Sequence, residues 1–313
     1  MMTIRQIYDQ YIYSRSTYCS KETIEKYSDD LRLFFRFLER NYMISVDAAG
    51  FDALDQESIY QDYLVYCRNR KIKDSSVRSY ARSIKAFLRY CYDEDYCKDY
   101  LKKIKMPKSD AAPVLPLFEA DVIHIDTLLD RETEQGLRNY CIFHLMLDCG
   151  LRRQEVVHLQ VHDLNAAQNI LSIKKSKGNK SRFVLIPDFL IVALQQYFEL
   201  MHIRSGTMFL TLRTRKPITY NTIKMFYQDL KVESGIDRLH GHLLRHTFAI
   251  SFLIGGGNME FLRVFMGHFD YVSTKTYVEL ATQLKILGAP VYKLDPIFFK
   301  FGSPIFQNGL WQR

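Results

Sequence analysis

The sequence predicts a mainly α-helical protein with two domains, of which the second carries a small antiparallel β-sheet or hairpin. Three observations lead to this fold class. The chain has 313 residues, more than the roughly 100–200 of one ordinary domain. Apolar residues recur at three- and four-residue spacing over most of the length, which is typical of amphipathic helices. A proline-rich stretch near residue 110 separates a helical first part from a second part that includes two β-prone runs.

The first domain, residues 1–105, is expected to contain four amphipathic helices between Ile4 and about Asp95. Its apolar stripes are clearest in two sets, Leu31, Phe34, Phe35 and Leu38, and Ile84, Phe87, Leu88 and Cys91. Ser20 before Lys21, and Asp74-Ser75-Ser76 before Val77, are residues that favour the start of a helix.

A linker is predicted over residues 106–117, because three of the eight prolines fall there within ten residues. The second domain, residues 118–281, follows. Its expected helices cover about 118–130, 136–148, a segment from 152, 188–203, 219–233, 243–254, 258–266 and 272–281. Two strands, 169–174 and 181–186, flank Lys177 and Gly178 and predict a hairpin. Residues 282–313 form a tail.

The composition indicates a folded protein with a polyanionic partner. Hydrophobic residues make up 47% and charged residues 25%, which are values of ordinary globular chains. The net charge is +8, and the isoelectric point is near 9.0, so nucleic acid or a membrane surface is the expected partner. The apolar stretches, such as 141–147, are shorter than the roughly 18 residues that a spanning helix needs. The first residues lack a secretory signal pattern, so a cytoplasmic location is expected.

The positive charge is concentrated between Arg68 and Lys108. This run holds 13 Lys or Arg and 5 Asp or Glu, an excess equal to that of the whole chain. A solvated helix face and a surface that follows DNA phosphates explain it equally well. The six cysteines include no C-x-x-C pair and are interpreted as reduced packing residues.

Several polar motifs in the second domain have ordinary explanations when each is taken alone. Gly150 is suited to end a helix and leaves Arg152 at the start of the next one, where an anion could bind. Lys177 lies at the tip of the predicted hairpin. His242 and Arg245 project from one face of a helix. Gly267-His268 ends another helix, and Tyr277 follows nine residues later.

In this order the motifs resemble the tyrosine recombinase (phage integrase) family. The succession is Gly-Leu-Arg-x-x-Glu, Lys-Gly-Asn-Lys-x-Arg on a hairpin, His-x-x-Arg-His, then Gly-His and a tyrosine, over about residues 118–280. The first domain resembles the family's SAM-like core-binding domain. The whole chain is similar to compact Xer-like and transposon-type members.

The resemblance implies catalytic roles for six residues. The residues that would surround the scissile phosphate are Arg152, Lys177, His242, Arg245 and His268, and Tyr277 would attack it. Two guanidinium groups and imidazole donors suit the charge that develops on the phosphate oxygens, with no metal or other cofactor. A lysine on a hairpin could protonate the departing 5′ oxygen. The energy of the broken bond would stay in a 3′-phosphotyrosyl ester, so that rejoining needs no ATP.

Other polar residues receive supporting roles. Glu155 is expected to orient a cation, and His246 is expected to pack or support rather than react. The predicted DNA contacts are Arg78, Arg82, Lys85, Lys180 and Arg182, of which the last two could instead serve the solubility of the hairpin. Tyr271 and Tyr292 are competing nucleophiles, but neither keeps the nine-residue interval from His268.

The resemblance also implies partners. Double-stranded DNA with paired inverted-repeat sites would be the substrate for integration, excision, inversion or dimer resolution through a Holliday junction. A homotetramer would assemble on it, and accessory DNA-bending proteins could take part. The apolar tail is predicted to dock on a neighbouring protomer, with packing on its own domain as the alternative. Rival functions are a non-catalytic DNA-binding protein, a type IB topoisomerase and a metal-dependent hydrolase, although the histidines form no H-E-x-x-H pair.

Overall fold

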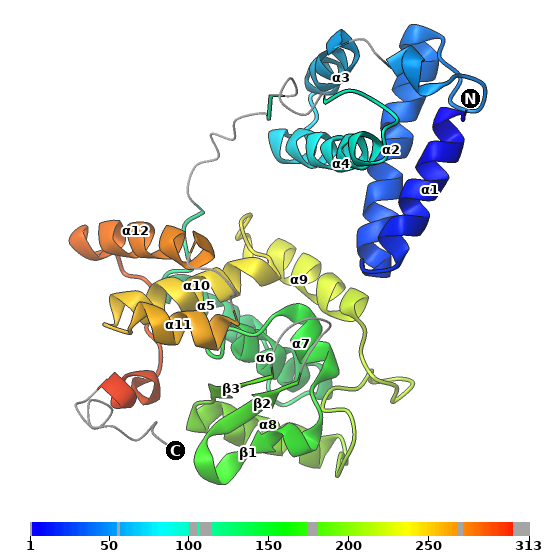
Figure 1. Ribbon diagram of the computed structural model, residues 1–313. Coiled ribbons are helices and arrows are strands. Elements are labelled where there is room, and N and C mark those ends of the chain that lie inside the picture. Colours follow the sequence, from blue (N-terminus) through cyan, green and yellow to red (C-terminus); the bar gives the residue numbers. More distant parts are fainter. Residues whose placement is uncertain are drawn as a thin grey trace, which may run out of the picture. The chain divides into compact units, whose positions relative to one another are not determined.

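The computed structural model describes residues 2–54, 57–99, 105–106, 114–174, 181–267 and 272–302, without the side chains of 57, 272–276 and 300–302. The chain divides into two compact units, Met1–Ala112 and Pro113–Arg313, here called unit 1 and unit 2. Figure 1 shows helices throughout both units and a sheet in unit 2. The predicted fold class is therefore confirmed.

Unit 1 contains the four predicted helices. They are α1 (Ile4–Ser16), α2 (Lys21–Tyr42), α3 (Glu57–Asn69) and α4 (Asp74–Asp93), with a short 3-10 turn, η1 (Phe51–Leu54). Ser20 caps α2 as expected, because its hydroxyl accepts from the amide of Thr23. The expected cap of α4 is wrong. Lys73 occupies the N-cap without a side-chain hydrogen bond, and Asp74 lies in the first turn, where a carboxylate favours the positive end of the helix dipole.

Helices α2 and α4 form the centre of unit 1, and one buried carboxylate joins them. Asp30 of α2 accepts hydrogen bonds from Ser83 of α4 at 2.6 Å and from Lys26 at 3.2 Å. The apolar face of α4, which includes Val77, Ile84 and Leu88, packs into a core of aromatic side chains. The opposite face of α4 is left for polar residues.

Unit 2 is built from helices around a small sheet. The helices are α5 (Glu119–Leu128), α6 (Glu134–Leu147), α7 (Arg153–His158), α8 (Asp188–Leu200), α9 (Tyr220–Ser234), α10 (Gly241–Ile254), α11 (Met259–Met266) and α12 (Val272–Ile286), with 3-10 turns η2 (Val161–Asp163), η3 (Ala166–Gln168) and η4 (Pro296–Gly302). Every residue of α6 from Leu137 to Leu147 is buried, so α6 is a core helix. It packs against α8 and α10, and α10 packs against α12.

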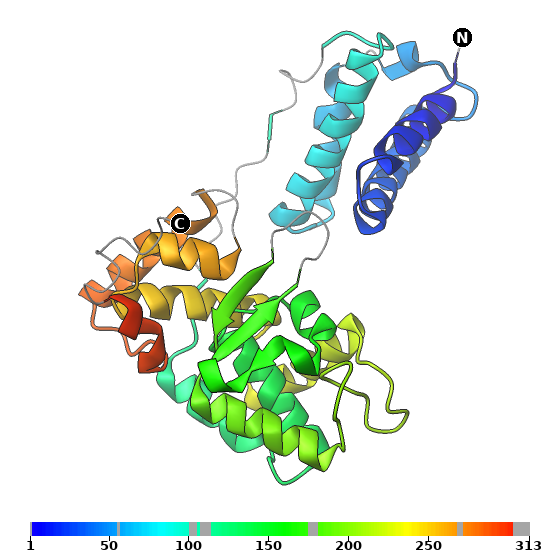
Figure 2. The same ribbon diagram turned by 60° about the horizontal axis from the view of Figure 1, so that its bottom comes forward.

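The sheet has three antiparallel strands in the order β1-β2-β3, seen face on in Figure 2. They are β1 (Leu164–Asn165), β2 (Ile170–Ile173) and β3 (Arg182–Leu185). Ile170 lies opposite Leu185 and Ile173 opposite Arg182, so the two predicted hairpin strands do pair. Strand β1 was not predicted, because two residues carry no alternating pattern. The predicted turn with Lys177 lies outside the described residues.

The segment that leads into α5 pairs with the segment that follows α12. The amide of Glu119 donates to the carbonyl of Pro290 at 3.0 Å, and the amide of Tyr292 donates to Leu117 at 3.3 Å. Farther on, Phe299 of η4 stacks on Phe252 of α10, next to Gly255, where a Cβ would lie 2.3 Å from the Phe299 ring. The described part of the tail therefore packs on its own unit.

Candidate active site

The candidate active site begins where α6 ends. Gly150 has a φ of +62°, and a Cβ there would lie 2.7 Å from Cδ1 of Phe248 in α10. Only glycine meets both conditions, since it has no side chain and tolerates positive φ. The close contact of Gly150 with Phe248 lets the chain pass over α10, and Arg152 then occupies the N-cap of α7. The sequence-based expectation for Gly150 did not foresee the contact with Phe248.

Glu155 lies at the centre of a cluster of cations. Its carboxylate accepts from the backbone amide of Arg152 at 2.7 Å, from the Arg152 guanidinium at 3.0 Å, and from two nitrogens of Arg182 at 2.7 and 2.9 Å. Burial would raise the pKa of Glu155, but the hydrogen bonds and charge of Arg182 outweigh it and lower the pKa to about 2. Glu155 is thus an anion that orients two arginines, in agreement with its expected supporting role.

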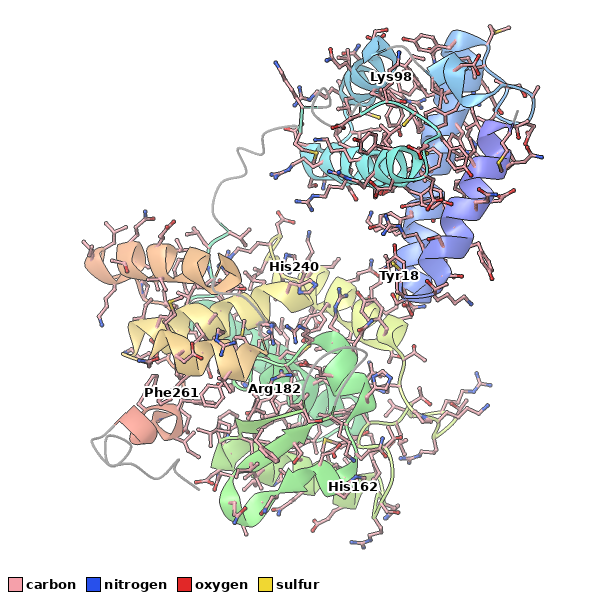
Figure 3. The ribbon with its side chains drawn as sticks, in the orientation of Figure 1. Tyr18, Lys98, His162, Arg182, His240 and Phe261 are labelled. Atoms are coloured by element: carbon pink, nitrogen blue, oxygen red, sulfur yellow. The ribbon has the colours of Figure 1, made fainter. Side chains whose placement is uncertain are left out.

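Arg182 is placed differently from the prediction. Its side chain is 8% exposed, and its third nitrogen, Nε, donates to the carbonyl of Phe265 in α11 at 2.7 Å. Figure 3 shows Arg182 between the sheet and α11. All three nitrogens donate to protein acceptors, so in this structure Arg182 joins β3 to α7 and α11 rather than facing a DNA backbone. The sequence could not show this, because Glu155 and Arg182 are 27 residues apart.

Arg245 is the most deeply buried cation of the site, with 5% of its surface exposed. Its guanidinium donates to the carbonyls of Gly150 and Met266. Arg152 donates to the neighbouring carbonyl of Gly267 at 3.3 Å. Burial, and next the charge of Arg152, lower the pKa of Arg245 to about 9, which still leaves it protonated at neutral pH. The two arginines therefore converge on the end of α11, directly before residue 268.

His242 and Tyr277 lie within the electric field of these arginines. His242 follows Gly241 in the first turn of α10. Partial burial, and after it the charges of Arg153, His240, Arg245 and Arg152, lower its pKa, which favours a neutral imidazole. Burial raises the pKa of Tyr277 on α12, while the charges of Arg245 and Arg152 act to lower it. Tyr277 also packs against the apolar cluster that includes Met266, the residue whose carbonyl accepts from Arg245.

His246 of α10 contacts both Tyr277 and the segment before α5. Its Nε2 donates to the carbonyl of Val114 at 2.6 Å, and its ring centroid lies 5.2 Å from that of Tyr277. It connects α10 with the segment that leads into α5. This contact fits the expected packing role better than direct chemistry.

Tyr292 is half-buried and belongs to a separate hydrogen-bond network. Its hydroxyl donates to Asp148 at 2.9 Å, and the other oxygen of Asp148 is 2.8 Å from His144, whose second ring nitrogen is 2.9 Å from Asp126. Burial raises the pKa of Tyr292 far above its usual range. These contacts count against Tyr292 as a nucleophile. Nothing in the sequence had singled out this network, since Tyr292 and Asp148 are 144 residues apart.

Three predicted site residues, Lys177, Lys180 and His268, lie outside the described residues, as does Tyr271. Arg152 and Arg245 meet at the end of α11, and their charges act on His242 and Tyr277.

On α4 of unit 1, Arg82 is exposed, whereas Arg78 and Lys85 are partly exposed. With Arg89, a residue not predicted, they are spaced four, three and four residues apart and so share one face of the helix.

Among the described residues, no three His, Cys, Asp or Glu side chains are grouped so that they could hold a metal ion. No helix in the described ranges is long and apolar enough to cross a membrane.

The fold and the arginine cluster beside a tyrosine define the class: this is an enzyme of the tyrosine recombinase type. The chain belongs to the phage integrase family. The model of that family matches residues 121–283, and the model of the phage integrase SAM-like domain matches residues 3–106. The resemblance inferred from the motifs is therefore confirmed, as is the SAM-like character of the first domain.

Curated relatives are similar over most of the chain. Tyrosine recombinase XerC of Staphylococcus haemolyticus is 25% identical over 271 residues, which cover 84% of this chain and 88% of that protein. Tyrosine recombinase XerC of Staphylococcus aureus strain JH9 is 26% identical over 270 residues, with the same coverage of 84% and 88%.

Solved structures share the fold. The Tn1549 transposon integrase in complex with transposon right end DNA has a TM-score of 0.70 at 16% identity and covers 92% of this chain and 100% of its own. A lambda integrase dimer bound to a COC′ core site has a TM-score of 0.71 at 15% identity, with 88% of this chain and 95% of its own covered.

Proposed function

We propose that the protein is a site-specific DNA recombinase that cleaves and rejoins strands through a covalent 3′-phosphotyrosyl intermediate. One observation carries the proposal: Arg152 and Arg245 donate to adjoining carbonyls at the end of α11, and their charges act on the phenol of Tyr277. A phosphate between these guanidinium groups would lie next to a nucleophile. The DNA-bound integrases of the same fold and the XerC relatives support the choice of substrate.

The chemistry follows from the positions of the side chains. Tyr277 gives its proton to water as its oxygen bonds to the phosphorus, and the bond from phosphorus to the 5′ oxygen breaks. Each guanidinium group has five N–H donors in one plane, so both arginines can bind non-bridging oxygens with the donors that their carbonyl contacts leave over. Neutral His242 supplies a further donor. Lys177 would protonate the 5′ oxygen, and His268 would complete the set.

The stabilisation of charge by fixed donors replaces a metal ion in this scheme. Glu155 sets the position of Arg152 and needs no contact with DNA. Because the phosphotyrosyl ester conserves the energy of the cleaved bond, attack by a 5′ hydroxyl restores the DNA without ATP.

Recombination further needs two DNA sites and several protomers. We expect a homotetramer on paired inverted-repeat sites, with exchange through a Holliday junction and with accessory DNA-bending proteins where the site requires them. Ile286 and Leu287 at the end of α12 are 80% and 77% exposed, so they suit a contact with a neighbouring protomer. Val291, Leu294 and Phe298 are buried in their own unit and would have to detach in order to dock elsewhere.

The basic face of α4 is the proposed DNA contact of unit 1. Each lysine or arginine that neutralises a phosphate releases counterions and makes binding weaker at higher salt. Arg78, Arg82, Lys85 and Arg89 are therefore expected to raise the affinity for any duplex, whatever its sequence.

A nicked suicide duplex tests the proposal. It is made from inverted repeats that flank the gene and is incubated with the full chain in the presence of a chelator. Peptide mapping should find the DNA adduct on Tyr277, and Tyr277→Phe should form none while binding with unchanged affinity. An adduct on another residue, or strand exchange by Tyr277→Phe, would refute the assignment. Relaxation of plasmids that lack any specific site would indicate a type IB topoisomerase, and binding without an adduct would indicate a non-catalytic protein.

A further inference from the structure

Arg153 is a cation beside the candidate active site that the family motifs leave without a role. It is the first residue of α7, directly after Arg152. Its guanidinium carbon lies 4.4 Å from the centroid of the Tyr220 ring, which is the shortest such contact among the described residues. Tyr220 is the first residue of α9 and is 41% exposed. The stacked pair therefore lies at the surface, where α7 and α9 both begin.

A third element fixes the position of the Arg153 side chain. A Cβ at Gly241, the first residue of α10, would lie 2.9 Å from Cδ and 3.0 Å from Cγ of Arg153. The stem of Arg153 thus passes over a point of the backbone where only glycine leaves room. Figure 3 shows His240, the N-cap of α10, at this end of the helix. Helices α7, α9 and α10 together hold one guanidinium group in place.

The charge of Arg153 is not neutralised by an ion pair with any described residue. The side chain is partly exposed, and no carboxylate of a described residue forms an ion pair with it. Glu155, the acidic residue of the same helix, is occupied by Arg152 and Arg182. The charge of Arg153 also acts on His242, which follows Gly241. A fixed and unpaired cation of this kind is suited to an anionic ligand.

Stacking leaves the donors of Arg153 available. With its carbon 4.4 Å from the Tyr220 ring centroid, a guanidinium group parallel to the ring keeps its five N–H bonds pointing outward in its own plane. A phosphate at the edge can therefore accept two parallel hydrogen bonds without breaking the stack. The neighbouring anion that a DNA strand presents to such a group is the next phosphate of its backbone.

We propose that Arg153, held between Tyr220 and Gly241, binds a second backbone phosphate of the DNA strand, adjacent to the one held by Arg152 and Arg245. The contact would fix the register of the strand at the site. This inference rests on the proposed function, since it takes DNA as the ligand.

Salt dependence of binding gives the first test. The full chain with Tyr277→Phe is titrated with the labelled recombination site over a range of salt concentrations. Adding Arg153→Gln should lower the slope of log Kd against log salt by about 0.9 and weaken binding ~10-fold at low salt. The matched control is Arg131→Gln, because Arg131 also stacks on a tyrosine, Tyr140, at 5.2 Å, but precedes the opposite end of α6. Its slope should not change. Equal slopes for the Arg153→Gln chain and its parent would overturn the inference.

Neutral phosphates give the second test. Methylphosphonates are placed one at a time along the strand, and the binding of the parent chain and of the Arg153→Gln chain is compared. A methylphosphonate next to the scissile phosphate should weaken DNA binding by the parent chain. The same substitution should not weaken binding by the Arg153→Gln chain any further. Tyr220→Leu keeps the charge of Arg153 and should preserve the salt slope. It should lower the DNA affinity and reduce the effect of a methylphosphonate at that one position. Identical profiles in parent and variant would contradict the inference.

The two proposals can fail separately. If Tyr277 forms the adduct and the methylphosphonate profile is unaffected by Arg153→Gln, then the function stands and the phosphate contact is wrong. If the profile changes as expected and no adduct forms, then Arg153 binds DNA in a protein that does not cleave it. Circular dichroism of each variant shows whether it is folded before it is compared.

Discussion

Arg182 donates to both carboxylate oxygens of Glu155, at 2.7 and 2.9 Å, across a sequence separation of 27 residues. Both side chains are 8% exposed. The pair joins β3 to α7, and Glu155 in turn holds Arg152 by two further hydrogen bonds. A contact between the sheet and a helix therefore determines the position of a candidate catalytic arginine.

Removal of one partner of this pair should be costly. Glu155→Gln leaves the buried Arg182 without its counterion, so we expect unit 2 to lose ~3–5 kcal/mol of stability. The double variant Glu155→Gln, Arg182→Met should lose less than the sum of the two single variants, since no charge is then left unpaired. Urea unfolding followed by hydrogen exchange of unit 2 peptides measures this. Strict additivity would show that the pair is not coupled.

The His144 network predicts a pH dependence of stability. Burial would lower the pKa of His144, but the hydrogen bonds to Asp126 and Asp148 raise it to about 9, above the ~6.5 of an unfolded chain. The stabilisation is therefore complete below pH ~6.5 and is lost as the pH rises through about 9. We expect the wild type to lose up to ~3 kcal/mol over this interval relative to His144→Gln.

The matched control for this measurement is His124→Gln, which changes an exposed histidine of α5 and leaves the His144 network intact. A His144→Gln chain that loses as much stability as the wild type between pH 6.5 and 9 would show that His144 is neutral in the folded protein.

Gly150 should not tolerate a side chain. Gly150→Ala combines a positive φ with a Cβ 2.7 Å from Phe248, so we expect a loss of at least ~3 kcal/mol and reduced adduct formation. Gly206→Ala is the control. Gly206 has a φ of +79° and no atom within 4 Å of the added Cβ, so only the backbone strain of ~1 kcal/mol remains. Equal losses for the two variants would mean that the contact with Phe248 has no cost.

Tyr292→Phe separates packing from chemistry. The variant leaves Asp148 without one donor and should destabilise unit 2 by ~1–3 kcal/mol, while the adduct on Tyr277 still forms. Tyr13→Phe, at a tyrosine that is 77% exposed, should change neither quantity. An adduct lost in Tyr292→Phe but kept in Tyr277→Phe would reverse the assignment of the nucleophile.

The sequence predicted the helices and the motif residues, because both depend on patterns within short stretches of the chain. Amphipathic spacing located the helices of both units, and Gly150, Arg152, His242, Arg245 and Tyr277 stand out through ordered motifs. In the structure Arg152 and Arg245 meet at the end of α11, and their charges act on His242 and Tyr277.

Other features depend on contacts between distant parts of the chain, and the sequence could not reveal them. Arg182 looked like a surface residue of a hairpin, because nothing near it indicates that Glu155 is its partner. The stack of Arg153 on Tyr220 and the bond from Tyr292 to Asp148 likewise join helices and segments far apart in sequence. Strand β1 is too short for any periodicity.

The backbone pairing of residues 117–119 with residues 290–292 has a practical consequence for protein engineering. Because the segments before α5 and after α12 meet side by side, a chain shortened after Tyr292 could be joined to Leu117 by a short bridge, with loss of the contacts of Leu294 and Phe298, and new ends could be opened at the exposed loop around Gly206. Such a circular permutant would keep the arginine cluster and the tyrosine intact, and it would supply the catalytic half as an independent module.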